Sequence, residues 1–131
     1  MLKKTITYTD YNNVERTEDF WFNLTESEIV EMEVSEEGGL QQYLERITKT
    51  NDAKKIVDIM KQIILKAYGE KSSDGRRFIK VDAEGHNLAS DFAQTPAYSK
   101  LFMEVAFDAQ EAAKFIKAIF PTESLKAIVE K

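Results

Sequence analysis

The sequence predicts a mainly α-helical α+β fold, in which an N-terminal two-stranded antiparallel β-hairpin packs on a bundle of about six helices. Two patterns predict it. Polar and apolar residues alternate up to residue 22, and apolar residues recur at helical spacing over most of the remaining chain. The 131 residues, 43% of them hydrophobic, suit one packed core. We therefore expect a single domain, 1–131, with the hairpin in 1–24 and the helical part in 25–131.

Residues 3–22 carry the hairpin pattern, because threonines alternate with larger side chains and a second β-rich alternation follows a polar break. Asn12-Asn13 suits the centre of the turn, since asparagine tolerates positive φ better than most residues. The second strand ends in Phe20-Trp21-Phe22. Neighbouring side chains on a strand point to opposite faces, so both faces of the hairpin carry large apolar surface there.

Helical signals begin directly after the hairpin. Thr25 and Glu28 match a capping box, which predicts a helix that runs to about Ser35 and stops before Gly38-Gly39. A second helix is expected to begin at about Leu40.

The most regular pattern lies in 52–68 and predicts an amphipathic helix of about four turns. Its apolar residues recur at three- and four-residue steps: Ile56, Ile59, Met60, Ile63, Ile64 and Ala67. We expect this helix to be the central one.

A long polar connection is expected over 69–87, with a turn at Asp74-Gly75, and a short helix over 87–94. Thr95-Pro96 places an N-cap and a first-turn proline at the start of the next helix, and Asp108 caps the helix after it. A proline ends that helix and allows a last short one.

Composition excludes several classes of function. With 18 Lys+Arg against 23 Asp+Glu, the net charge of −5 argues against general binding to nucleic acid or to an anionic membrane. The absence of cysteine removes disulfides and thiolate chemistry and fits a reducing compartment. No apolar run reaches the length of a transmembrane helix, and no secretory signal is visible. We therefore expect a cytosolic protein without a nucleic-acid or membrane partner.

Few residues could carry catalysis. His86, the one histidine, follows Asp82 and Glu84 in an arrangement similar to two oxygen ligands and a nitrogen ligand, but a solvated loop histidine is the simpler interpretation. The glycines form neither a dinucleotide fingerprint nor a phosphate-binding loop. We expect no catalytic residue, no cofactor site and no metal site, and hence no enzyme.

Charge is segregated along the chain. Residues 17–45 contain nine acids and no Lys or Arg, whereas 46–80 contain ten basic residues and four acids. Like charges could simply line the exposed faces of successive helices, or they could form a docking surface for an oppositely charged partner or a second copy. In the basic segment, lysines alternate with apolar residues at helix spacing, which favours a basic helix face over a nucleic-acid groove.

Two apolar features could exceed what a core of this size buries: the aromatic end of the second strand and the stretch 115–121. Each is either ordinary core or a protein interface. Together with the basic face of the 52–68 helix they give the candidate partner-binding residues, which are Phe20, Trp21, Phe22, Lys54, Lys55, Lys61, Phe115 and Phe120.

Six segments carry a resemblance to a known family: KTITYTD (4–10), ERTEDFWFNLT (15–25), GGL (38–40), IILKAYGEKS (63–72), DGRRF (74–78) and FAQTPAY (92–98). With these segments the chain resembles the tail assembly chaperones of long-tailed, siphovirus-type phages and prophages of Gram-positive bacteria. The resemblance spans nearly the whole chain and lies in the residues of these segments and in their order, without a catalytic signature.

The resemblance implies a non-enzymatic chaperone in the cytoplasm of the infected bacterium. Such a protein coats the long helical tape measure protein, keeps it soluble, and is displaced as tail tube subunits polymerise, so it is absent from the mature virion. In such phages a ribosomal frameshift commonly adds a C-terminal domain that helps to recruit the tail tube protein.

Two alternatives remain open from the sequence: a small phage or prophage regulator that binds a host protein, and an RNA-binding module that uses the basic middle segment. Self-association is also expected, because a two-stranded sheet leaves two edges that a neighbouring copy can pair with.

Overall fold

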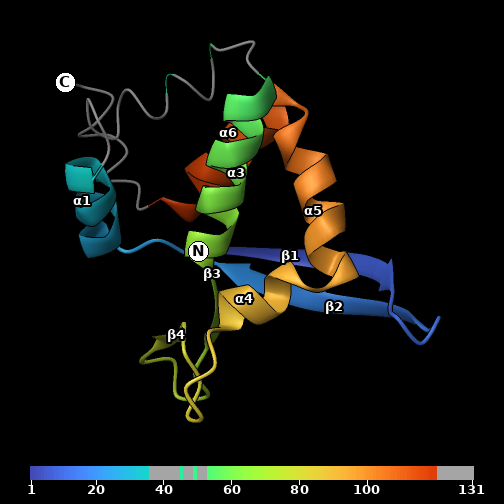
Figure 1. The fold of residues 1–131 in the computed structure, drawn as a ribbon. Coiled ribbons are helices and arrows are strands. Elements are labelled where there is room, and N and C mark those ends of the chain that lie inside the picture. Colours follow the sequence, from blue (N-terminus) through green and yellow to red (C-terminus); the bar gives the residue numbers. More distant parts are fainter. Residues whose placement is uncertain (36–44, 46–48, 50–52, 121–131) are drawn as a thin grey trace.

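The predicted hairpin is present in the computed structural model, which describes residues 1–35, 45, 49 and 53–120. Strands β1 (Leu2–Thr9) and β2 (Glu15–Phe22) pair antiparallel over their whole length, from Leu2 opposite Phe22 to Thr9 opposite Glu15. The helices α3, α5 and α6 stand on one side of this pair, and α1 lies beside them (Figure 1).

The turn of the hairpin lies one residue earlier than expected: the Asn13 N–H donates to the Asp10 carbonyl at 3.0 Å, so Tyr11-Asn12 is the central pair, and Asn13 follows it at a left-handed φ of 61°. Asp10 holds the turn. One of its carboxylate oxygens accepts hydrogen bonds from the Asn12 and Val14 backbone N–H groups at 2.8 and 3.0 Å, and the other accepts one from Arg16 Nε at 2.6 Å. The Arg16 guanidinium, with these N–H groups, lowers the pKa of Asp10.

The prediction of a two-stranded sheet is wrong, because the sheet has four strands in the order β1-β2-β3-β4. Strands β3 (Tyr68–Lys71) and β4 (Phe78–Ile79) lie where a polar connection was expected. Their four and two residues are too short to show an alternation in sequence. The expected turn at Asp74-Gly75 is present between them, with Gly75 at a φ of +74°.

Five α-helices occur in the described part of the chain: α1 (Glu26–Ser35), α3 (Ala53–Ala67), α4 (Leu88–Ala93), α5 (Pro96–Ala106) and α6 (Ala109–Ile119). The predicted bundle of about six helices is therefore not exact for these residues. The helices expected from Leu40 and after Pro121 lie outside the described residues.

The helix starts confirm the capping signals in the sequence. The Thr25 N–H donates to Glu28 Oε1 at 2.9 Å, and the Glu28 N–H donates to Thr25 Oγ1 at 3.2 Å, which completes the capping box. Thr95 Oγ1 accepts from the Tyr98 N–H at 3.2 Å, and Asp108 Oδ1 accepts from the Gln110 N–H at 2.9 Å.

The core is centred on Phe22, whose side chain has no exposed surface. Its ring lies 5.7 Å from that of Tyr68, 5.8 Å from that of Phe92 and 5.3 Å from that of Phe115, so one strand end meets β3, α4 and α6. The next two backbone N–H groups extend these contacts: Asn23 donates to the Ala67 carbonyl at 2.8 Å, and Leu24 donates to that of Ile119 at 3.1 Å.

Lys80 connects the strands to two helices. Its Nζ donates to the Lys66 carbonyl in the last turn of α3 at 2.6 Å and to the Asn23 carbonyl at 3.5 Å, and it lies 3.7 Å from Glu28 Oε2 at the start of α1. Burial lowers the pKa of Lys80, and the Glu28 carboxylate opposes that shift. Lys80 thus satisfies an unpaired helix-end carbonyl while placing a cation at the negative end of α3.

We predict that Phe22→Ala lowers the free energy of unfolding by about 3–5 kcal/mol, because the cavity opens between rings from three elements. Chemical denaturation followed by circular dichroism measures this change. Tyr11→Ala in the hairpin turn is the matched control: its side chain is 82% exposed, so its effect stays within about 0.5 kcal/mol. A loss below about 1 kcal/mol for Phe22→Ala would contradict this description of the core.

Candidate interaction surface

The sheet has one face against the helices and one face whose described side chains are largely exposed. Alternation places Phe22 and Ile6 on the inner face and therefore places Trp21 on the outer one. Trp21 lies opposite Lys3 of β1 and opposite Gly69 of β3. It is half-buried, so an aromatic ring remains accessible on a face that no other aromatic of the hairpin shares.

Two lysines flank this ring. The Nζ atoms of Lys3 and Lys71 each lie 5.8 Å from the Trp21 ring centroid, one from β1 and one from β3. This distance is within the range of a cation–π contact. The pair therefore surrounds an aromatic ring with positive charge in an otherwise acidic protein.

Phe78 extends the aromatic surface across β3. It pairs with Lys71 in the register of β3 and β4, and its ring covers Gly69, where an added Cβ would lie 2.6 Å from Phe78 Cε2. Gly69 thus leaves room for the ring. Lys80 Nζ lies 5.1 Å from the Phe78 centroid, but its ammonium group is bonded to the Lys66 carbonyl. We call Lys3, Trp21, Lys71 and Phe78 the aromatic–lysine cluster.

The rest of the outer face is polar. Thr5 Oγ1 donates to Asp19 Oδ1 at 2.7 Å, and the Thr7 and Thr17 hydroxyls lie 2.9 Å apart. A depression of about 400 Å³ lies beside Trp21, and residues 18–21 of β2 and 68–71 of β3 line it. The outer face therefore offers one aromatic, positively charged end and one end of threonines and acids.

The exposed side of α3 is a second positively charged surface. Ile59, Met60, Ile63, Ile64 and Ala67 face the core, as predicted, while its lysines Lys54, Lys55, Lys61 and Lys66 are exposed beside a single acid, Asp58. Helix α1 carries four glutamates and no basic residue. The acidic and the basic stretches of the sequence thus lie on separate helices, α1 and α3.

His86 belongs to a solvent-exposed loop. Asp82 Oδ1 accepts hydrogen bonds from the backbone N–H groups of His86 and Glu84 at 2.8 and 2.9 Å, and His86 Nδ1 lies 3.2 Å from Asp82 Oδ2. The backbone N–H of His86 is the largest cause of the lowered pKa of Asp82. Within the described residues no three His, Cys, Asp or Glu side chains are grouped as a metal ion requires.

Comparison with known protein families gives one match that covers residues 1–131, and the description of that family is phage tail assembly chaperone. The chain belongs to the phage tail assembly chaperone family. The comparison with curated proteins found no match, and neither did the comparison with solved structures. In the described part of this chaperone, no helix is both long enough and apolar enough to cross a membrane.

The structure divides the candidate residues of the chaperone into two groups. Phe22, Phe115 and Phe120 are buried, so their side chains stabilise the core and offer a partner almost no surface. Phe20 is half-buried on the inner face, with its ring 5.2 Å from that of Phe92. The accessible candidates are the half-buried Trp21 and the exposed Lys54, Lys55 and Lys61.

Sequence reasoning missed three members of the cluster, namely Lys3, Lys71 and Phe78. Lys3 could have been found from strand alternation, because it shares the face of Trp21 once the hairpin register is known. Lys71 and Phe78 could not, because their position depends on two short strands that the sequence does not indicate.

We predict that Gly69→Ala destabilises the chaperone by about 1–3 kcal/mol, because the new Cβ meets the Phe78 ring and also lies 2.8 Å from the Ile79 carbonyl oxygen. Thermal and chemical denaturation measure this loss, and the Trp21 fluorescence should shift with it. Ser73→Ala, at an exposed position in the β3–β4 turn, is the control. Unchanged stability of Gly69→Ala would mean that Phe78 does not cover this glycine.

Proposed function

We propose that this chaperone binds the tape measure protein of its own phage, a long-tailed phage or prophage of a Gram-positive host, and keeps it soluble while the tail tube polymerises around it. The observation that carries the proposal is the accessible Trp21 ring between Lys3 and Lys71. The family gives the general role in tail assembly, and its description names no reaction. We propose that the role is non-catalytic.

The aromatic–lysine cluster suits an amphipathic helix with acidic flanks. Aromatic rings are typical anchors of protein interfaces, and flat rings accept the apolar side of a helix. The ammonium groups of Lys3 and Lys71 would then pair with carboxylates on either side of that apolar stripe. A helical client longer than one chaperone domain could also reach the exposed lysines of α3.

The size of the cluster suits reversible binding. A surface built around Trp21 and Phe78 is small, and small interfaces with exposed charge pairs are typical of transient complexes. We propose that tail tube subunits displace the chaperone from its client in the host cytoplasm, so that it is absent from the mature virion. A longer frameshifted form would recruit the tail tube protein.

Co-expression with the tape measure protein of the same genome tests this function. We predict a soluble complex with several copies of the chaperone on a client that precipitates when expressed alone. Pull-down followed by size-exclusion chromatography with light scattering gives the number of copies.

An insoluble and unbound client, with the longer form also supplied, would contradict the proposal. Recovery of a host protein under the same conditions would favour the regulator hypothesis. Recovery of RNA that depends on Lys54, Lys55 and Lys61 would favour the RNA-binding hypothesis.

Trp21→Ala tests the contact surface. We predict that it weakens client binding by about 2 kcal/mol or more, roughly a thirtyfold higher Kd, because an interface anchor is lost. Tyr11→Ala removes an exposed aromatic from the same hairpin and should leave binding unchanged. Circular dichroism shows whether each variant is folded. Equal client recovery by folded Trp21→Ala and by Tyr11→Ala would place the contact elsewhere.

A further inference from the structure

Helix α5 lies beside the outer edge of the sheet, and one of its sides is uncovered by any described element. Strand β1 ends the strand order, so its outer edge has no neighbouring strand among the described residues. Lys100 of α5 reaches this edge and donates from Nζ to the Thr7 carbonyl at 2.8 Å. A lysine side chain at the edge of a sheet disfavours pairing of that edge with another strand. A partner at this side of the molecule would therefore contact α5.

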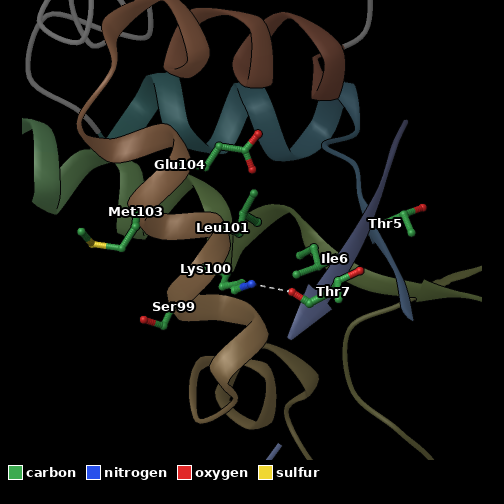
Figure 2. A pocket seen from close by; sticks show the side chains of 8 residues that line it. All are labelled: Thr5, Ile6, Thr7, Ser99, Lys100, Leu101, Met103 and Glu104. Carbon is green, nitrogen blue, oxygen red and sulfur yellow. Dashed lines mark hydrogen bonds between the residues drawn. The ribbon is translucent and has the colours of Figure 1, made fainter. Parts of the chain in front are cut away.

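A depression of about 540 Å³ lies between α5 and β1. Ser99, Lys100, Met103 and Glu104 line it from α5; Figure 2 shows Lys100 directed to Thr7, and the Ser99 and Met103 side chains on the side of the helix away from β1. Ser99 and Met103 are one helical turn apart, and so are Lys100 and Glu104, so they form two neighbouring rows along α5, which we call the α5 stripe. The depression is open, which leaves space for a second helix alongside α5.

The stripe is more apolar than a solvated helix face usually is. Met103 is 60% exposed and Phe107, one turn further at the end of the helix, is 61% exposed. Phe107 also contacts Phe102, with ring centroids 6.1 Å apart. Large apolar side chains that are adjacent and exposed typically mark an interaction site.

The charges on this stripe are self-complementary. Lys100 and Glu104 lie one turn apart on the flank of the stripe that faces the sheet, and each has its own partner within the molecule: Thr7 for Lys100, and Lys4 for Glu104 at 3.0 Å. When two copies of such a helix meet antiparallel, the same flanks face each other. Each lysine then lies opposite the glutamate of the other copy, whereas in a parallel two-fold pair this flank would face the opposite flank of the other copy.

We propose that α5 is the contact between two copies of this chain, related by a two-fold axis near Met103. The two helices pack antiparallel at the usual 8–10 Å or so. Met103 lies beside Met103 of the second copy, and Ser99 leaves room for Phe107 of the second copy. Lys100 pairs with Glu104 of the second copy, and both pairs close over the depressions. The interface is isologous, as in most two-fold dimers.

The dimer does not depend on the client, because the stripe and the aromatic–lysine cluster lie on different sides of the sheet. A dimer presents two copies of the cluster to one long client. Binding of the second copy then becomes intramolecular, which raises the overall affinity without a new contact.

A charge-reversal experiment tests the interface. Lys100→Glu gives a chain with glutamate at both positions, and Glu104→Lys gives one with lysine at both, so each variant alone faces like charges across the axis. We expect the unmodified chain to have twice the 15.0 kDa mass of one chain in light scattering. At the concentration where the unmodified chain is dimeric, each variant should be monomeric, with a dimer dissociation constant roughly a hundredfold higher.

Mixing the two variants at equal concentration should restore the dimer mass, because glutamates then face lysines at both positions. Lys114→Glu, an exposed charge reversal on α6, is the control and should remain dimeric. An unmodified chain that is monomeric up to about 500 µM would overturn the proposal. So would a dimer that survives both reversals, or folded variants that fail to combine. Client pull-down with Lys100→Glu separates this proposal from the proposed function, since client binding should persist.

Discussion

The burial of Phe22 is the constraint on which the rest of the structure depends. Its ring meets rings from β3, α4 and α6, and the two residues that follow it bond to the ends of α3 and α6. These elements lie far apart in the sequence, so local propensity cannot bring them together. Burying one large ring among three others compensates for the entropy of closing those loops.

The orientation of Phe22 also determines the candidate interaction surface. Because successive side chains on a strand alternate, a buried Phe22 directs Trp21 to the opposite face. A slip of one residue would exchange the two rings, leaving a phenylalanine outside and an indole in the core. The register that places Lys3 beside Trp21 is therefore fixed by the core, while Lys71 and Phe78 are positioned by the pairing of β3 with β2 and with β4.

Local signals allowed the sequence to predict the hairpin, the capped starts of three helices and the apolar face of α3, since each depends on a few neighbouring residues. The predicted sheet lacked two of the four strands, because β3 and β4 exist only through pairing with β2 and with each other. The candidate site was only partly predicted for the same reason. Whether an aromatic such as Phe115 or Trp21 is core or surface depends on packing across the chain, which no local pattern records.

The acidic composition and the positive aromatic–lysine cluster are compatible, because the charges are separated in space. Arg16 pairs with Asp10 in the hairpin turn, and Lys80 pairs with Glu28 at the start of the acidic helix α1. Among the described residues, no carboxylate forms an ion pair with Lys3 or Lys71, whose Nζ atoms each lie 5.8 Å from the Trp21 ring centroid. An overall charge of −5 disfavours polyanions, while this local positive potential favours a protein helix with carboxylates at matching positions. Under the proposed function, this difference between net and local charge is what would favour a protein client over nucleic acid.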